Sequence, residues 1–280
     1  MEILRGRARK HSLKILINDK ILFHDMMSYY GLPVPKILFV FKNDSFFINN
    51  RDVTDEEIDR ALCSRTDTRI FIKLPSEGAA RGVFIMTKKD DGYIFNDKKV
   101  TAQSLRSFFK GETLFFEEQI EQEPVLKSFN PDTINTIRVL TKNVGGKKEI
   151  VMAAARFGRK GQYVDNMCAG GIAVRIDIKT GALGSYGERR FESKRYTVHP
   201  DSEIPFKGVV IPQWEEIKKV VYETLSCFPP YRSLGFDIAT TPNGLVVLEI
   251  NTGAGVNLAQ VGGEYGIADS FKMGKNGRYS

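Results

Sequence analysis

The sequence has few cysteines and histidines and no long apolar run. Cys63, Cys168 and Cys227 lie far apart and form no C-x-x-C pair, which argues against a disulfide framework or a zinc site and favours a reducing, cytoplasmic compartment. The histidines are equally scattered, which argues against a histidine metal site. No apolar stretch approaches the roughly 18–20 residues of a membrane-spanning helix. The basic start of the chain lacks the apolar core of a signal peptide, so we expect neither a membrane span nor secretion.

The composition is that of a globular chain with excess positive charge. Its 280 residues are 42% hydrophobic, enough for a large core and two or three subdomains. The net charge is +7, and much of the excess lies near the two ends of the sequence. This charge fits either a solvated surface or affinity for an anionic partner such as a nucleotide, a sugar phosphate or nucleic acid.

Short apolar runs separated by turn residues predict many strands and few helices. Capping residues and apolar periodicity predict helices over 18–30, 54–63, 102–110 and 214–225. Strands and helices mix without strict βαβ alternation, which indicates an α+β fold with antiparallel sheets.

The stretch GFDIATTPNGLVVLEIN, residues 235–251, places polar residues at the ends of two apolar runs. Pro-Asn-Gly at 242–244 suits a three-residue hairpin loop, with Gly244 in the left-handed bulge position. That loop places Asp237 directly opposite Glu249, with about 4.5–5.5 Å between opposing positions. Asn251 is two residues from Glu249 and shares its strand face. We therefore expect three side-chain oxygens to converge on one face.

Two carboxylates this close repel each other unless a cation lies between them. Mg²⁺ prefers oxygen ligands, accepts one or two protein carboxylates and completes its shell with water and substrate phosphates. The alternative is a polar strand end that faces solvent. Because three ligand-type residues converge, the sequence favours a magnesium site at Asp237, Glu249 and Asn251.

If magnesium binds phosphates here, other segments should supply positive charge and backbone N–H groups for the same phosphates, and the sequence contains such segments. Lys73 ends a predicted strand, and the loop PSEGAARG with Gly78 and Gly82 follows it. Such a loop can close backbone N–H groups over phosphates while the lysine supplies a point charge. Lys20 lies in the first turn of the helix expected at 18–30, where N–H groups favour an anion.

Four segments in a fixed order resemble the ATP-grasp superfamily: NDKILFHDMMSYYGLPVPK (18–36), FIKLPSEGAARG (71–82), FFEEQI (115–120) and GFDIA…LEIN (235–251). More narrowly, NTIRVLT (135–141), AAARFG (153–158) and DN…GGIAV (165–174) look like the sugar-transfer-associated ATP-grasp proteins, which sit in polysaccharide-biosynthesis gene clusters and relate to glutamate ligases.

The resemblance implies an ATP-grasp fold in which two α+β subdomains with antiparallel sheets clasp ATP. The expected parts are an N-terminal segment (1–66), a lid subdomain (67–120) and a C-terminal subdomain with the metal site (121–280). By the same resemblance, phosphate contacts fall to Lys20 and Lys73, and adenine contacts to Glu117, Gln119 and Ile120. Asp237, Glu249 and Asn251 hold two Mg²⁺ ions, for which Mn²⁺ can substitute, with Glu249 bridging. Arg156 occupies the place of a residue that binds the γ-phosphate.

The sequence also departs from the related ligases. They carry an arginine two residues before the metal-binding aspartate, where this sequence has Gly235. Either Arg138 takes over that role or the acceptor chemistry differs. Only 17 residues precede the segment that begins at Asn18, where most relatives place a full α/β domain.

Three functions remain open at this point. The first is a ligase that joins a small-molecule or sugar carboxylate to an amine through an acyl phosphate, which requires no side-chain nucleophile. The second is a kinase with a hydroxyl acceptor, in which Asp165 supplies the base; Asp165 and Asn166 are the expected substrate contacts in either case. The third is a basic binding module for RNA or polysaccharide, which leaves the metal-ligand set unexplained and makes nucleic acid the least favoured partner.

Overall fold

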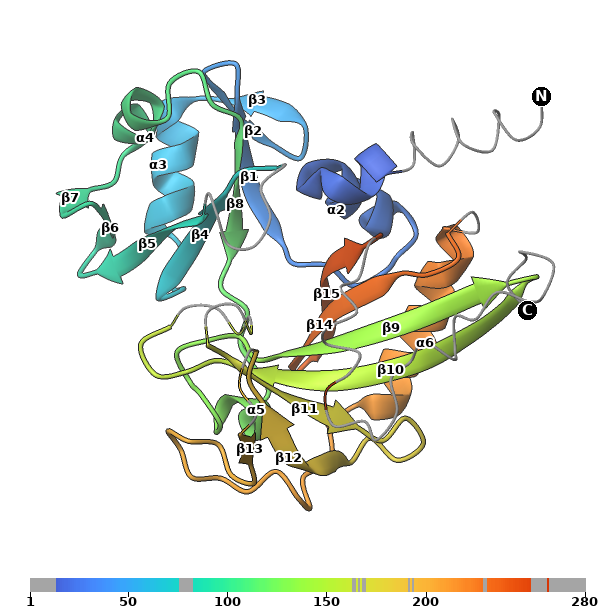
Figure 1. Ribbon diagram of the computed structural model, residues 1–280. Helices are drawn as coiled ribbons and strands as arrows, with labels where there is room; N and C mark the ends of the chain where they lie inside the picture. Colours follow the sequence, from blue (N-terminus) through green and yellow to red (C-terminus); the bar gives the residue numbers. More distant parts are fainter. Residues whose placement is uncertain are drawn as a thin grey trace. The chain divides into compact units, whose positions relative to one another are not determined.

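The computed structural model describes residues 14–75, 83–162, 165, 167, 170–190, 192, 194–228, 231–252 and 261 (Figure 1). Three residues expected at the site, Gly78, Gly82 and Asn166, lie outside the described part. The chain divides into two compact units. The larger comprises Met1–Asn18, Leu22–Val34 and Glu121–Ser280, and the smaller comprises Asp19–Ile21 and Pro35–Ile120.

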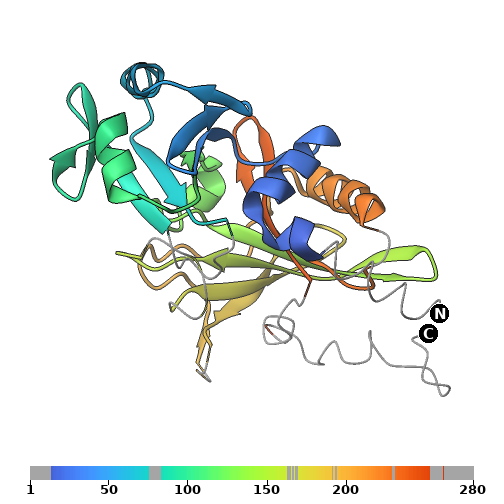
Figure 2. The same cartoon turned by 90° about the horizontal axis from the view of Figure 1, so that it is seen from above.

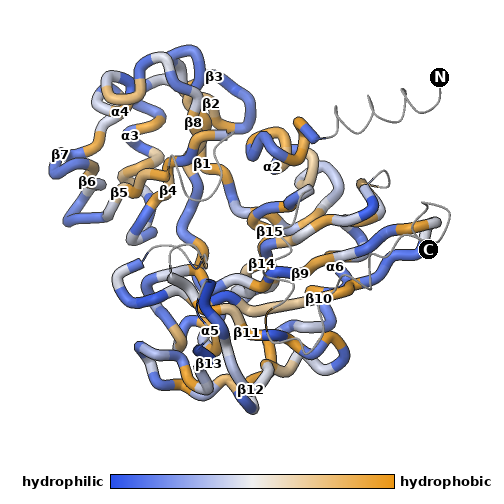
Figure 3. The backbone as a smooth tube through the Cα atoms, in the orientation of Figure 1, coloured by the Kyte–Doolittle hydropathy of each residue, from blue (hydrophilic) through white to orange (hydrophobic). Residues whose placement is uncertain are grey.

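The smaller unit contains one antiparallel sheet of eight strands in the order β3-β2-β1-β8-β4-β5-β6-β7. The strands are β1 (Ile37–Lys42), β2 (Ser45–Ile48), β3 (Arg51–Val53), β4 (Arg69–Lys73), β5 (Val83–Lys89), β6 (Gly92–Phe95), β7 (Lys98–Lys99) and β8 (Leu114–Glu118). In Figure 3 the turn that joins β5 to β6 is hydrophilic, as its sequence KKDDG requires.

Two helices cover one face of this sheet: α3 (Asp55–Cys63) and α4 (Ala102–Phe108) (Figure 1). Both begin at threonines with complete capping boxes, which satisfy the first free N–H groups of each helix. Ile70 and Ile72 of β4 pack in the core beneath the helices. Alternation along the strand therefore places Phe71 and Lys73 on the opposite face.

The larger unit is built on an antiparallel sheet of seven strands in the order β13-β12-β11-β10-β9-β14-β15. The strands are β9 (Thr136–Val144), β10 (Lys147–Phe157), β11 (Ile172–Ile176), β12 (Leu183–Glu188), β13 (Arg195–Tyr196), β14 (Gly235–Thr241) and β15 (Gly244–Asn251). The two longest, β9 and β10, lie side by side in both views (Figures 1 and 2).

Helix α6 (Trp214–Cys227) covers one face of this sheet. Its buried side chains at Ile217, Val221 and Leu225 recur at helical spacing and pack in the main core with the inward residues of β9, β10 and β14. The short α5 (Pro124–Lys127) and the part of α2 (Lys20–Tyr29) that includes Phe23 and Met27 complete this core. The opposite sheet face carries a smaller apolar cluster that includes Leu140, Met152 and Ala154, beside polar residues such as Arg138 and Asp237.

The α+β class with antiparallel sheets is confirmed by this topology. The expected N-terminal segment (1–66) is divided between the two units: Met1–Asn18 and Leu22–Val34 group with Glu121–Ser280, and the rest belongs to the smaller unit. Residues 35–66 share a sheet with residues 67–120 instead of forming a separate N-terminal segment, because β1 pairs with β8. The smaller unit ends at Ile120, and the larger unit continues from Glu121. Within the described ranges, no helix has both the length and the apolar character to cross a membrane.

Asn135 joins three segments of the larger unit just before β9. Its Nδ2 donates to Gln122 Oε1 at 2.8 Å, to the Leu126 carbonyl at 2.9 Å and to the Asn130 carbonyl at 3.0 Å. Its Oδ1 accepts from the Gly158 N–H at 3.1 Å, and the residue is fully buried. The side chain thus uses both ends of its amide.

We expect Asn135→Ala to lower the free energy of unfolding by about 2–4 kcal/mol, because it leaves several buried partners unsatisfied. Urea denaturation followed by circular dichroism measures this change. Asn243→Ala, at the exposed turn between β14 and β15, is the control and should change the free energy by less than about 0.5 kcal/mol. Equal effects of the two substitutions would contradict the structural role assigned to Asn135.

Candidate functional site

The hairpin of β14 and β15 places Asp237 directly opposite Glu249, as predicted. The turn that joins the two strands differs from the expected three-residue loop. Thr241 pairs with Gly244, so the turn contains only two residues, and Gly244 opens β15 with a φ of +136°. The register then shifts between Asp237 and Ile238, which leaves Leu248 as an extra residue in β15. This bulge, and not the turn, brings the two carboxylates into register.

The three predicted metal ligands occupy one face of the sheet. Phe236, Ile238 and Ile250 pack in the core with α6. Because neighbouring residues of a strand point to opposite faces, Asp237, Glu249 and Asn251 lie on the face away from that core.

Two arginines on adjacent strands of this face bind Asp237. Arg138 of β9 is the cross-strand partner of Asp237; its Nε donates to Oδ1, and its Nη2 donates to Oδ2 at 2.7 Å. Arg156 of β10 places Nη2 3.2 Å from the same Oδ2. Burial acts to raise the pKa of Asp237, but Arg156 and Arg138 outweigh it and hold the pKa below its ordinary value. Both predicted catalytic arginines therefore lie beside the predicted metal ligands.

Asp165 anchors Arg156 from the other side. Its Oδ2 accepts from the Thr136 N–H at 2.9 Å and from the Thr136 hydroxyl, and it lies 3.4 Å from Arg156 Nε. Arg156 in turn donates from Nε to Thr136 Oγ1 at 2.9 Å. Burial raises the pKa of Asp165, and Arg156 opposes this rise. Sequence reasoning missed Thr136, although it alternates with Arg138 on β9 and so shares its face.

The residues at Asp237 fit a divalent cation by their donor chemistry. Among the described residues no group of three or more His, Cys, Asp or Glu is arranged to hold a metal; the predicted set instead combines two carboxylates with one amide. Asn251 Nδ2 is buried and has no hydrogen-bond partner. Because an amide can rotate to exchange its nitrogen and oxygen, Oδ1 can take that buried position. Carboxylate and amide oxygens are ligands that Mg²⁺ accepts.

In the smaller unit, Lys73 and Glu117 form an ion pair. Lys73 Nζ donates to Glu117 Oε1, and the two side chains come from neighbouring strands β4 and β8. The Lys20 N–H donates to the Pro75 carbonyl at 3.0 Å, so Lys20 lies near the segment that follows Lys73. The two lysines predicted to bind phosphate thus belong to adjoining segments of one unit.

Gln119 and Ile120 follow the last residue of β8. Gln119 Oε1 accepts from the Thr68 hydroxyl at 2.5 Å, while Ile120 is half-buried. These two residues and Glu117 lie on one short stretch of chain at the end of the smaller unit, and their contact with adenine stays a prediction.

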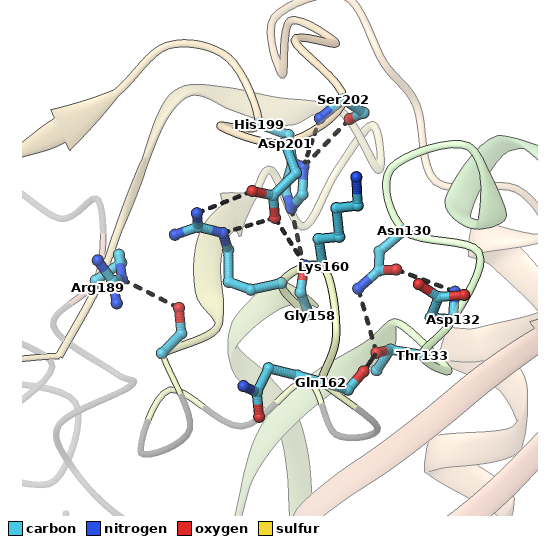
Figure 4. Close-up of polar contacts among 12 residues, drawn as sticks. Asn130, Asp132, Thr133, Gly158, Lys160, Gln162, Arg189, His199, Asp201 and Ser202 are labelled. Carbon is cyan, nitrogen blue, oxygen red and sulfur yellow. Dashed lines mark hydrogen bonds and ion pairs between the residues drawn. The ribbon is translucent and has the colours of Figure 1, made fainter.

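The loop after β10 is held from three sides (Figure 4). Nε2 of the fully buried His199 donates a hydrogen bond to the Gly158 carbonyl at 2.9 Å. Asp201 accepts from Arg159 at 2.7 and 2.9 Å and from the Lys160 N–H at 2.8 Å. A Cβ at Gly158 would lie 2.7 Å from Thr133, so only glycine allows this close packing. The loop is thereby fixed directly after the strand that carries Arg156.

We expect the stability gained from Asp201 to decline in acid. Its hydrogen bonds with Arg159 lower the pKa of Asp201 to about 2, so this stability is complete above the unfolded pKa of 3.8 and is lost as the pH falls through about 2. The free energy of unfolding of Asp201→Asn should therefore lie about 2 kcal/mol below wild type at pH 6, and the gap should narrow by about 1 kcal/mol at pH 3. Urea denaturation at both pH values measures the difference in unfolding free energy between wild type and Asp201→Asn. A difference that is the same at pH 6 and pH 3 would contradict the ion pair between Asp201 and Arg159.

A family model described as sugar-transfer associated ATP-grasp matches residues 3–274. No curated protein matches the chain. Among solved structures, D-alanyl-alanine synthetase A from Vibrio cholerae O1 biovar eltor str. N16961 is 13% identical, with a TM-score of 0.49 over 85% of this chain and 56% of its own.

Two further solved structures are similar at 10% identity and a TM-score of 0.48. They are an ADP complex of N5-carboxyaminoimidazole ribonucleotide synthetase (84% of this chain, 45% of its own) and N5-carboxyaminoimidazole synthetase from Staphylococcus aureus complexed with ADP (88% and 47%). The chain thus spans about half the length of the solved structures that it matches.

Proposed function

The chain belongs to the sugar-transfer associated ATP-grasp family, and from this we propose that it is an ATP- and magnesium-dependent carboxylate–amine ligase. The observation that carries the proposal is the face on which Asp237 and Glu249 stand opposite each other with Arg138 and Arg156 beside them. Such a cluster suits the transfer of a highly charged phosphoryl group, where catalysis consists mostly of positioning and charge stabilisation.

In the proposed reaction the substrate carboxylate attacks the γ-phosphorus of ATP, which gives an acyl phosphate and ADP. The amine then attacks the acyl carbon, expels phosphate and forms the amide bond. Asp237, Glu249 and Asn251 would hold the magnesium ions, which neutralise the charge of the phosphates. Arg156 binds the transferring phosphoryl group with a guanidinium suited to bidentate contacts, and Arg138 orients the carboxylate.

The remaining expected residues have roles in the same proposal. Lys20, Lys73 and the backbone at Gly78 and Gly82 bind the phosphates, while adenine is bound at Glu117, Gln119 and Ile120. Asp165 holds Arg156 in position. Asp165 and Asn166 also lie beside the acceptor substrate. The substrates we propose are an acidic sugar or another small carboxylate and an amine, joined in polysaccharide biosynthesis. The free thiols of Cys63 and Cys227 support a reducing cytoplasm as the compartment.

A kinase on the same scaffold is the second candidate, but the contacts of Asp165 count against it. A general base must be able to accept the proton of the attacking hydroxyl. Asp165 Oδ2 already accepts two hydrogen bonds from Thr136 and lies against Arg156. The carboxylate is therefore better placed to hold Arg156 than to receive a proton.

A coupled assay of ADP release tests the proposal against this alternative. The screen combines amino acids and uronic-acid sugars with and without amine donors. A ligase releases ADP at full rate only when acid and amine are both present. Full-rate ADP release with a hydroxyl acceptor alone would instead identify a kinase, and binding of RNA or polysaccharide that survives EDTA and needs no ATP would favour a binding module.

A further inference from the structure

The Thr136 hydroxyl lies between two charged side chains of the candidate site. Thr136 of β9 and Arg156 of β10 are cross-strand partners on strands that lie side by side (Figure 1). Thr136 Oγ1 donates to Asp165 Oδ2, and it accepts from Arg156 Nε at 2.9 Å and from Arg156 Nη2 at 2.5 Å. All three side chains are buried. The hydroxyl is therefore at the centre of a buried charged cluster.

This cluster uses every hydrogen-bonding site of the hydroxyl, which has one donor and two acceptor sites. The Thr136 N–H also donates to Asp165 Oδ2, at 2.9 Å, so this carboxylate oxygen is an acceptor and the hydroxyl proton points toward it. The two lone pairs of the hydroxyl then receive the two N–H groups of Arg156. The direction of the hydroxyl is thereby fixed by Asp165, and the hydroxyl in turn fixes one edge of the guanidinium.

The same edge of the guanidinium faces Asp237. Arg156 Nη2 lies 3.2 Å from Asp237 Oδ2, and Arg156 Nε lies 3.4 Å from Asp165 Oδ2. Both distances are longer than those from the same nitrogens to Thr136 Oγ1. Because the guanidinium is planar, contacts at Nε and Nη2 together determine the direction of its plane. The hydroxyl thus supplies the short contacts that orient Arg156 beside Asp237.

Thr141 of the same strand shows what a buried threonine hydroxyl does away from the site. Thr141 is fully buried, and its Oγ1 donates to the backbone carbonyl of Leu234 at 3.0 Å. The β conformation needs neither hydroxyl, since valine has the same branched shape and also favours strands. A buried hydroxyl costs free energy unless it is hydrogen-bonded, so its partners indicate its role. Thr141 bonds to the backbone, whereas Thr136 bonds to two charged side chains of the site.

We propose that Thr136 is a positioning residue whose hydroxyl holds Arg156 in the orientation that binds the γ-phosphate, so that the preference for ATP over ADP depends on this hydroxyl. The inference rests on the proposed function for the role of Arg156. Thr136 acts through Arg156 and does not itself contact the nucleotide. Loss of the hydroxyl should therefore weaken recognition of the third phosphate and leave the binding of ADP unchanged.

The test measures binding, so it does not depend on turnover. Isothermal titration in excess Mg²⁺ gives the dissociation constants of ADP and of a non-hydrolysable ATP analogue, and their ratio measures the contribution of the γ-phosphate. Thr136→Val removes the hydroxyl and keeps the branched shape, while Thr136→Ser keeps a hydroxyl. Thr141→Val is the matched control, because it removes a buried hydroxyl from the same strand. Circular dichroism establishes that each variant is folded, and Thr136→Ala replaces Thr136→Val if the latter does not fold.

We expect wild type to bind the ATP analogue about tenfold more tightly than ADP, as a charge-assisted contact to phosphate allows. Thr136→Val should reduce this preference to less than about threefold and change the dissociation constant of ADP by less than about twofold, because a hydrogen bond to a charged group is lost only at the γ-phosphate side. Thr136→Ser and Thr141→Val should keep the wild-type preference.

Three results would overturn the inference: an unchanged preference in Thr136→Val, equal weakening of both nucleotides by Thr136→Val, or an equal loss of preference in Thr141→Val. Arg156→Ala separates this failure from failure of the proposed function. If Arg156→Ala loses the preference and Thr136→Val keeps it, only the role of Thr136 is wrong. If Arg156→Ala keeps the preference, the proposed role of Arg156 is wrong, and the role of Thr136 falls with it.

Discussion

Glu249→Gln will lower ADP release by at least about a thousandfold while leaving the protein folded. Glu249 faces Asp237 across the β14–β15 pair and is the carboxylate expected to bridge two metal ions. The amide keeps the shape of the side chain but removes the charge, and a thousandfold loss corresponds to about 4 kcal/mol of transition-state stabilisation. Without metal, the variant should stay folded, because Asp237 keeps its contacts with Arg138 and Arg156.

The coupled ADP assay and urea denaturation together measure this prediction. Glu149→Gln is the matched control, since Glu149 lies on β10 in the same sheet and pairs with Lys147 at 2.6 Å. That variant should release ADP at the wild-type rate. A folded Glu249→Gln protein with near-wild-type ADP release would rule out the metal assignment.

Arg156→Ala will reduce both activity and stability. The Arg156 side chain is almost fully buried between Asp165 and Asp237, and it also donates to Thr136. Removing one partner of a buried charge cluster leaves carboxylates without compensation, which costs about 3–5 kcal/mol of unfolding free energy. The loss of a guanidinium aimed at a phosphoryl group should also lower the rate of acyl-phosphate formation by about 100- to 1000-fold.

A double variant separates the two effects of Arg156. The double variant Arg156→Met/Asp165→Asn also removes the negative charge of Asp165, which would otherwise be buried without its partner. Urea denaturation should therefore show a higher free energy of unfolding than for Arg156→Ala. ADP release should stay low, because the phosphoryl-binding group is still absent. If Arg156→Ala changes the unfolding free energy by less than about 1 kcal/mol, the buried network does not hold this part of the sheet.

Local signals in the sequence were sufficient for the fold class and for the facing pair at the candidate site. Alternating apolar residues identify the strands, and the capping box at Thr54 predicts α3 correctly. Asp237 and Glu249 face each other as predicted, yet the predicted loop was wrong by one residue and the bulge at Leu248 offsets that difference. A bulge depends on packing on both faces of a sheet, which the hairpin sequence alone does not contain.

The arrangement around the arginines could not be predicted from local sequence. Arg138 and Asp237 are 99 residues apart in the chain, and only the β9–β14 pairing brings them together. Thr136 and Asp165 are joined in the same way, by contacts across 29 residues. The membership of residues 35–66 in the smaller unit likewise depends on the non-local pairing of β1 with β8. Sequence spacing identifies ligand-type residues, while strand order decides which charges surround them.

Titration of Mn²⁺ into the protein with a bound ATP analogue, followed by electron paramagnetic resonance, tests the central claim most directly. The claim is that Asp237, Glu249 and Asn251 hold the metal ions on which ATP-dependent ligation relies. Wild type should bind two ions per chain, and Glu249→Gln and Asp237→Asn should each bind Mn²⁺ at least tenfold more weakly, with Glu149→Gln unchanged. Equal Mn²⁺ binding by wild type and Glu249→Gln would contradict the account.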